Sequence, residues 1–178
     1  MYAYYAGVDK IAHERGLGAF YDAELRDADR LVGDLLDVLD ADTALVVTAD
    51  HGQVEVGDRI IEPSREVLGL TSGQSGEGRM RWFHAKRGAT AELFDAVQSE
   101  LGSTGWVRTI EEVIAEGWFG PRVPPPVRAR LGDVVVAAYE PVSYHDPDDS
   151  GPFELICRHG SLTAEEMLVP LIAARGRA

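Results

Sequence analysis

The chain has 178 residues, of which 45% are hydrophobic and 26% are charged, as is typical of globular proteins. Its length suits one domain, so we expect residues 1–178 to form a single domain. Seventeen basic and thirty acidic residues give a net charge of −13, which disfavours a nucleic-acid scaffold because phosphate backbones would be repelled.

The first predicted elements are a strand, a helix and a second strand. Aromatic and apolar residues at Tyr2–Val8 indicate a short buried strand that ends at Asp9. Apolar residues at helical spacing predict a helix over Ala19–Leu39, and the β-branched run Thr43–Thr48 predicts a strand covered on both faces. This order implies a right-handed crossover in a parallel sheet.

The rest of the chain alternates further strands and helices. Gly and Ser indicate a loop at Gly69–Gly78, Pro124–Pro126 should block regular structure, and Val142–Gly151 is predicted to be a polar loop. Strands are predicted at Arg79–His84, Trp106–Thr109, Val134–Ala138 and Met167–Ala173, with helices at Thr90–Leu101 and Ile110–Glu116. The expected fold class is α/β, with a mostly parallel central sheet and helices on both faces.

Cysteine content and apolar runs restrict the environment. Cys157 is the one cysteine, so a metal would have to bind His and carboxylates, and Cys157 itself is expected in the core. The N-terminus has no signal-peptide pattern, and the apolar runs are too short for the ~20 residues of a membrane helix. We therefore expect no membrane span and a cytoplasmic location, and the composition is compatible with a bacterial protein.

Three segments place Asp or His where an apolar strand gives way to a loop, which is where ligand sites form in open α/β sheets. They contain Asp9 with His13, Asp50 with His51, and His159. Asp9 and His13 are four residues apart, so one helical turn would bring both to the same side. Gly52 would ease a tight turn that lets Asp50 and His51 approach one ion. Carboxylate and imidazole ligands suit zinc, manganese and similar divalent ions.

The same segments carry a family resemblance. They read GVDKIAHERG at Gly7–Gly16, VVTADHGQ at Val46–Gln53 and RHGSLTAEEMLVPLI at Arg158–Ile172. In this order they resemble the alkaline phosphatase superfamily and, within it, the type I phosphodiesterase/nucleotide pyrophosphatase family. The last segment is similar to the family's closing His-Gly block, which ends in Glu-Met-x-Val-Pro, and the similarity runs nearly end to end.

The resemblance implies a hydrolase of phosphoric esters or phosphoanhydrides, with a phosphate-ester or nucleotide-like small molecule as substrate. It also implies two divalent ions, zinc or alternatively manganese. Asp9, His13 and His159 would bind one ion, and Asp50 and His51 the other. Two such ions, roughly 3.5–4 Å apart, stabilise the attacking and leaving oxygens and would supply the positive charge that this acidic chain lacks.

The chain also departs from the family pattern. Family members carry, before the segment matching Asp9, a half-domain with a further Asp ligand and a Thr or Ser nucleophile. We therefore expect this chain to correspond to the C-terminal half of the catalytic domain, with the N-terminal half absent and the nucleophile outside the chain. Its exposed sheet edge would then need a complementing N-terminal half or a homo-oligomer.

Several alternatives remain open at this stage. The chain could be a non-catalytic metal-binding fragment or interaction module, or part of a phosphomutase or phosphonate hydrolase relative. His145 with Asp146, Asp148 and Asp149 is interpreted as a solvated acidic loop, and the basic residues that alternate from Arg79 are interpreted as the exposed face of a strand.

Overall fold

The computed structural model describes residues 1–148 and 155–178, and its chain forms two compact units. Within the described residues, unit 1 comprises 1–58, 155–159 and 164–178, and unit 2 comprises 59–148 and 160–163. The single domain expected over 1–178 stays a prediction. No helix in the described ranges combines the length and apolarity needed to cross a bilayer.

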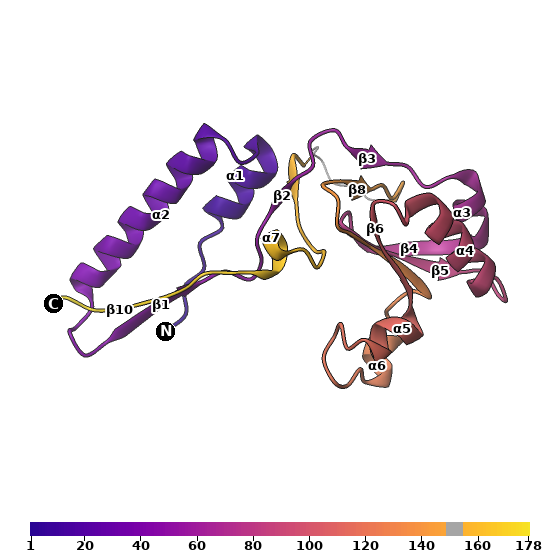
Figure 1. The fold of residues 1–178 in the computed structure, drawn as a ribbon. Helices are drawn as coiled ribbons and strands as arrows, with labels where there is room; N and C mark the ends of the chain where they lie inside the picture. The colour runs from indigo at the N-terminus through magenta and orange to yellow at the C-terminus, as the bar shows by residue number, and fades with distance from the viewer. Residues whose placement is uncertain (149–154) are drawn as a thin grey trace. The chain divides into compact units, whose positions relative to one another are not determined.

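Unit 1 contains three helices and two pairs of antiparallel strands (Figure 1). The helices are α1 (Gly7–Arg15), α2 (Ala19–Val38) and α7 (Ala164–Met167), and the pairs are β1 (Ala44–Thr48) with β10 (Leu171–Arg175) and β2 (Val54–Glu55) with β9 (Cys157–Arg158). Helix α2 confirms the helix predicted from apolar spacing, and β1 confirms the strand predicted at Thr43–Thr48.

The predicted strand at Tyr2–Val8 is wrong. Residues 1–6 are irregular and exposed, and helix α1 begins at Gly7. Within residues 1–148 and 155–178 no strand pairs with this segment, so its backbone groups have no ladder that would hold them extended. The parallel crossover expected from it does not form in unit 1.

Strand β1 instead pairs with the C-terminal strand β10, because the chain after α7 runs antiparallel to β1. The strand predicted at Met167–Ala173 therefore starts later, at Leu171, since Met167 still belongs to α7. The prediction that β1 is covered on both faces is also wrong: the strand alternates exposed and half-buried residues, and Val46 is 55% exposed.

Unit 2 is built on a four-stranded antiparallel sheet in the order β4-β5-β7-β6. Its strands are β4 (Thr71–Glu77), β5 (Met80–Ala85), β6 (Gly105–Thr109) and β7 (Val134–Ala138). Its helices are α3 (Arg65–Leu70), α4 (Thr90–Leu101), α5 (Ile110–Ala115) and α6 (Pro125–Arg128), and β3 (Ile60–Ile61) pairs in parallel with β8 (Ser143–Tyr144).

The core of unit 2 lies on both faces of this sheet. All residues of β7 are buried, since it lies between β5 and β6. Val134 and Val136 pack on one face with Leu93 of α4, whereas Val135 packs on the other face with Val113 of α5. The α/β class with helices on both faces is confirmed, but the mostly parallel sheet is wrong for this chain, because the strands of the four-stranded sheet are joined by antiparallel pairing.

Two predicted breaks in unit 2 carry regular structure. The predicted loop at Gly69–Gly78 contains β4. This strand pairs with β5 from Thr71 opposite Ala85 to Glu77 opposite Met80, and the pairing outweighs the low strand propensity of Gly and Ser. The prediction that Pro124–Pro126 blocks regular structure is wrong, because α6 starts at Pro125, and proline suits the first turn, where its missing N–H costs no hydrogen bond.

Two arginines expected on an exposed face are buried. Arg79 donates to the carbonyls of Ala138, Glu140 and Val142. Arg81 pairs with Asp146 at 3.2 Å, so Asp146 is buried rather than part of a solvated loop. Residues 149–151 of the predicted loop, including Asp149, lie outside the described residues.

Candidate metal centre

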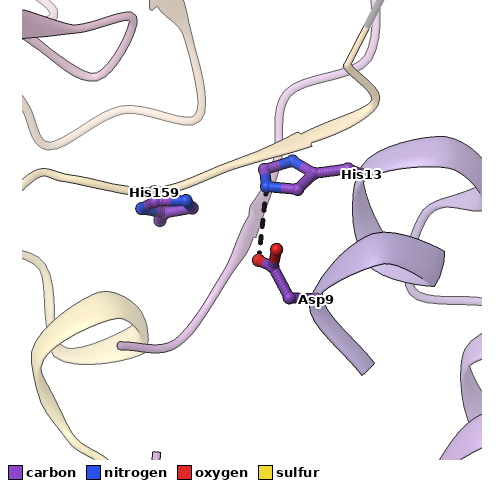
Figure 2. Close-up of side chains that lie close together, drawn as sticks. All are labelled: Asp9, His13 and His159. Carbon is purple, nitrogen blue, oxygen red and sulfur yellow. Dashed lines mark ion pairs between the residues drawn. The ribbon is translucent and has the colours of Figure 1, made fainter. Parts of the chain in front are cut away.

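Helix α1 brings the first two candidate ligands together. Asp9 and His13 are one turn apart, and Asp9 Oδ1 lies 3.2 Å from His13 Nε2, as the sequence spacing predicted (Figure 2). Asp9 stands in the first turn of the helix, where the helix dipole stabilises a carboxylate. Both side chains are partly shielded, with 37% of Asp9 and 17% of His13 exposed.

A backbone carbonyl determines which nitrogen of His13 is available. His13 Nδ1 lies 2.6 Å from the carbonyl oxygen of Cys157, and a carbonyl only accepts, so Nδ1 carries the proton. In the neutral ring Nε2 is then an acceptor, and it faces the acceptor Oδ1 of Asp9. Two facing acceptors need a proton or a cation between them. A carbonyl bonded to the second nitrogen is also the usual arrangement of a metal-binding histidine.

His159 completes a three-residue cluster with Asp9 and His13. It follows β9, and its ring centroid lies 5.4 Å from that of His13 at an interplanar angle of 48°. One potential ligand atom from each residue lies within 4.8 Å of the others (Figure 2). Adjacent ligands of tetrahedral zinc lie about 3.3 Å apart, given bonds of about 2.0–2.1 Å, so the 3.2 Å spacing of Asp9 and His13 fits a divalent ion.

The second predicted pair lies beside this cluster. The ring of His51 stacks on that of His159, with centroids 3.5 Å apart and 14° between the planes. His51 Nδ1 lies 2.9 Å from its neighbour's carbonyl at Gly52, which leaves Nε2 as the acceptor in the neutral ring. Asp50 Oδ1 is 3.8 Å from that Nε2 and its side chain is 70% exposed. The assignment of all five residues as ligands stays a prediction.

Gly52 is required for a different reason from the one expected. Its φ is not positive, but a Cβ at this position would lie 1.9 Å from the carbonyl oxygen of Glu165. The Gly52 N–H also donates to the carbonyl of Glu166 at 2.8 Å. The turn that carries His51 is therefore pressed against the start of α7, and only glycine fits there.

Sequence reasoning missed two contributors to the centre. Gln53 donates from Nε2 to Asp9 Oδ1 at 2.5 Å, and no spacing rule links these two positions. The other is the main-chain carbonyl of Cys157, which no side-chain pattern could reveal. The thiol of Cys157 is buried as predicted, and burial raises its pKa to about 11.

A family model described as type I phosphodiesterase / nucleotide pyrophosphatase matches residues 1–161. The chain belongs to this family. The resemblance read from the three sequence segments is thereby confirmed, and the family lies within the alkaline phosphatase superfamily. No curated protein sequence matches the chain significantly.

The chain also shares its fold with solved structures. The murine ectonucleotide pyrophosphatase / phosphodiesterase 5 is 21% identical, with a TM-score of 0.74 over 96% of this chain and 45% of its own. The human form is 17% identical, with a TM-score of 0.65 over the same shares. Phosphonoacetate hydrolase from Sinorhizobium meliloti 1021, in complex with phosphonoacetate, is 20% identical with a TM-score of 0.67, covering 95% of this chain and 44% of its own. The chain thus spans less than half the length of each of these three proteins.

Proposed function

We propose that this chain provides divalent-metal ligands for the hydrolysis of phosphoric esters or phosphoanhydrides, in the manner of a phosphodiesterase or nucleotide pyrophosphatase. The observation that carries the proposal is the convergence of Asp9 and His13, both on α1, with His159 from a distant part of the sequence. Family membership supports the reaction class, and a murine relative of this fold has been solved in complex with AMP.

In this proposal Asp9, His13 and His159 hold one ion, while Asp50 and His51 hold a second. When bound, two such ions act as Lewis acids that stabilise charge on the attacking and leaving oxygens. The bond from Nδ1 to the Cys157 carbonyl leaves His13 Nε2 available as a ligand atom, and stacking holds the ring of His51 against that of His159. Zinc is the proposed metal because imidazole and carboxylate suit it, and manganese is the alternative.

No nucleophile is proposed within the described residues. The resemblance implies a Thr or Ser that a further part of the family domain would provide. Thr48, whose hydroxyl lies near the Asp50 turn, is exposed on strand β1, and the hydroxyl is within hydrogen-bonding distance of the neighbouring Ala49 carbonyl. We therefore do not propose Thr48 as the nucleophile.

We also propose that a complementing polypeptide segment covers the ribbon formed by β1 and β10. Val46, Leu171 and Ile172 are 55%, 78% and 60% exposed, and exposed apolar groups of this kind mark interaction surfaces. The chain's 45% coverage of its murine relative supports a segment from the same family domain. Light scattering on the purified chain tests the proposal of a complementing segment. A stable homodimer that buries the ribbon would instead favour pairing of two copies of this chain.

The central experiment measures metal binding and hydrolysis on the same purified chain. Zn²⁺ or Mn²⁺ is titrated into the metal-free protein, and release of nitrophenol from a chromogenic phosphodiester is followed. We expect Asp9→Ala and His159→Ala to weaken metal binding and abolish any turnover. Asp27→Ala, at an exposed ion pair of α2, and His145→Ala, beside Glu62, are matched controls that should change neither.

The possible outcomes separate the alternatives. Turnover by the purified chain that Asp9→Ala abolishes would exclude a non-catalytic metal-binding module, whereas metal binding without turnover fits both that module and a nucleophile outside the chain. Absence of Zn²⁺ and Mn²⁺ binding at millimolar concentration would refute the proposed site. Turnover of phosphonoacetate in preference to the phosphodiester would favour the second candidate, a phosphonate hydrolase, which the likeness to phosphonoacetate hydrolase suggests.

A further inference from the structure

Gln53 is anchored by the same short sheet that positions the cluster. It directly precedes β2, which pairs with β9 through Val54 opposite Arg158 and Glu55 opposite Cys157. The next residue after β9 is His159, and the Cys157 carbonyl holds His13. The backbone of Gln53 is therefore fixed to the elements that carry the two histidines.

The side chain of Gln53 acts on one oxygen of Asp9. Its Nε2 lies 2.5 Å from Oδ1, and that same oxygen faces His13 Nε2 at 3.2 Å. Without this bond a carboxylate that is 37% exposed could rotate toward solvent. The amide N–H therefore constrains the Asp9 oxygen to the direction of the histidine.

The orientation of the amide is determined by this contact alone. Gln53 Oε1 is buried and has no hydrogen-bond partner among the described residues. A half-turn of the amide would bring Oε1 against Asp9 Oδ1, which places two acceptors in contact. A hydrogen bond to Oε1 therefore does not explain the position of the Gln53 side chain, whereas the bond from Nε2 to Asp9 does.

We propose that Gln53 is a positioning residue that orients the Asp9 carboxylate toward the cation bound by the three-residue cluster. The inference rests on the proposed function. Hydrogen-bond partners of ligating carboxylates typically change metal affinity by about 10–100-fold when they are removed. The expected effect is therefore a loss of affinity without loss of the fold.

The test measures Zn²⁺ alone, by competition with a chromophoric chelator, on the 178-residue chain and its variants. Gln53→Met removes the donor at nearly constant volume. Gln74→Met is the matched control, because Gln74 in β4 of unit 2 is also half-buried with an unpartnered Oε1. The visible absorption of bound Co²⁺ and the thermal midpoint of the metal-free chain are recorded for each variant.

We expect Gln53→Met to raise the Kd for Zn²⁺ by about 10–100-fold and to change the Co²⁺ spectrum, with the metal-free midpoint close to that of Gln74→Met. Equal Zn²⁺ affinity and equal Co²⁺ spectra in both variants and the parent chain would overturn the proposal. If Gln53→Met does not fold, Gln53→Asn decides, since its shorter amide should lose the contact with Asp9 and weaken Zn²⁺ binding by a similar factor.

The two proposals fail in different ways. If the parent chain binds no Zn²⁺, the proposed function fails and this inference fails with it. If the parent chain binds Zn²⁺ and Asp9→Ala abolishes binding, while the Gln53 variants bind as tightly as the parent, only the role of Gln53 is refuted.

Discussion

Replacing Gly52 by alanine tests the packing that holds the centre together. The added Cβ would lie 1.9 Å from the carbonyl oxygen of Glu165. Real Cβ atoms essentially never come closer than 3.0 Å to such an atom. The obstacle is backbone rather than a flexible side-chain end, so either the turn or the start of α7 must move by at least about 1 Å. That movement also disrupts the bond from the Gly52 N–H to Glu166.

The magnitude follows from these two effects. Overpacking costs about 1–3 kcal/mol, and the lost hydrogen bond adds about 0.5–1.5 kcal/mol, so the free energy of unfolding should fall by about 1.5–4.5 kcal/mol. For a chain of this size the thermal midpoint then falls by about 3–18 °C. Since the displaced turn carries His51 and Gln53, we also expect Zn²⁺ affinity to fall roughly tenfold or more.

Thermal and urea unfolding, followed by circular dichroism, measure the first effect, and chelator competition measures the second. Gly33→Ala is the matched control, because Gly33 lies inside α2 with no atom within 4 Å of the added Cβ. Alanine there should stabilise the helix by about 0.5–1 kcal/mol. An unfolding free energy and a Zn²⁺ affinity of Gly52→Ala that both match the parent chain would refute the reasoning.

Three further predictions concern single groups. The pKa of Cys157 is raised from 9.0 to about 11 mainly by burial, so DTNB should react slowly at pH 8 in the folded chain and rapidly in urea; equal rates would contradict this. Burial raises the pKa of Tyr144 from 10.0 to about 12, so its contribution to stability is complete below pH 10.0 and is lost as pH rises through 12; Tyr144→Phe should remove this slope in urea titrations. Thr109→Ala removes the capping box that Thr109 forms with Glu112 and should cost about 0.5–2 kcal/mol by thermal unfolding, whereas no change would show that the cap is unimportant.

Local patterns predicted the elements that depend on nearest neighbours in sequence. The helices at Ala19–Val38 and Thr90–Leu101 follow their apolar periodicity, and the Asp9–His13 contact follows from four-residue spacing on a helix. Two predictions failed because they depended on a partner strand that sequence does not reveal: among the described residues Tyr2–Val8 has no ladder to join, whereas Gly69–Gly78 gains one from β5.

By itself the sequence determined the family of this protein and the segments that carry its candidate cation ligands. The tertiary structure decided how they meet. His13 reaches a carbonyl 144 residues away, His159 stacks on His51, and Gln53 reaches Asp9. The physical reason is that helical spacing fixes contacts within a turn, whereas contacts between distant segments depend on the register of β2 with β9 and of β1 with β10.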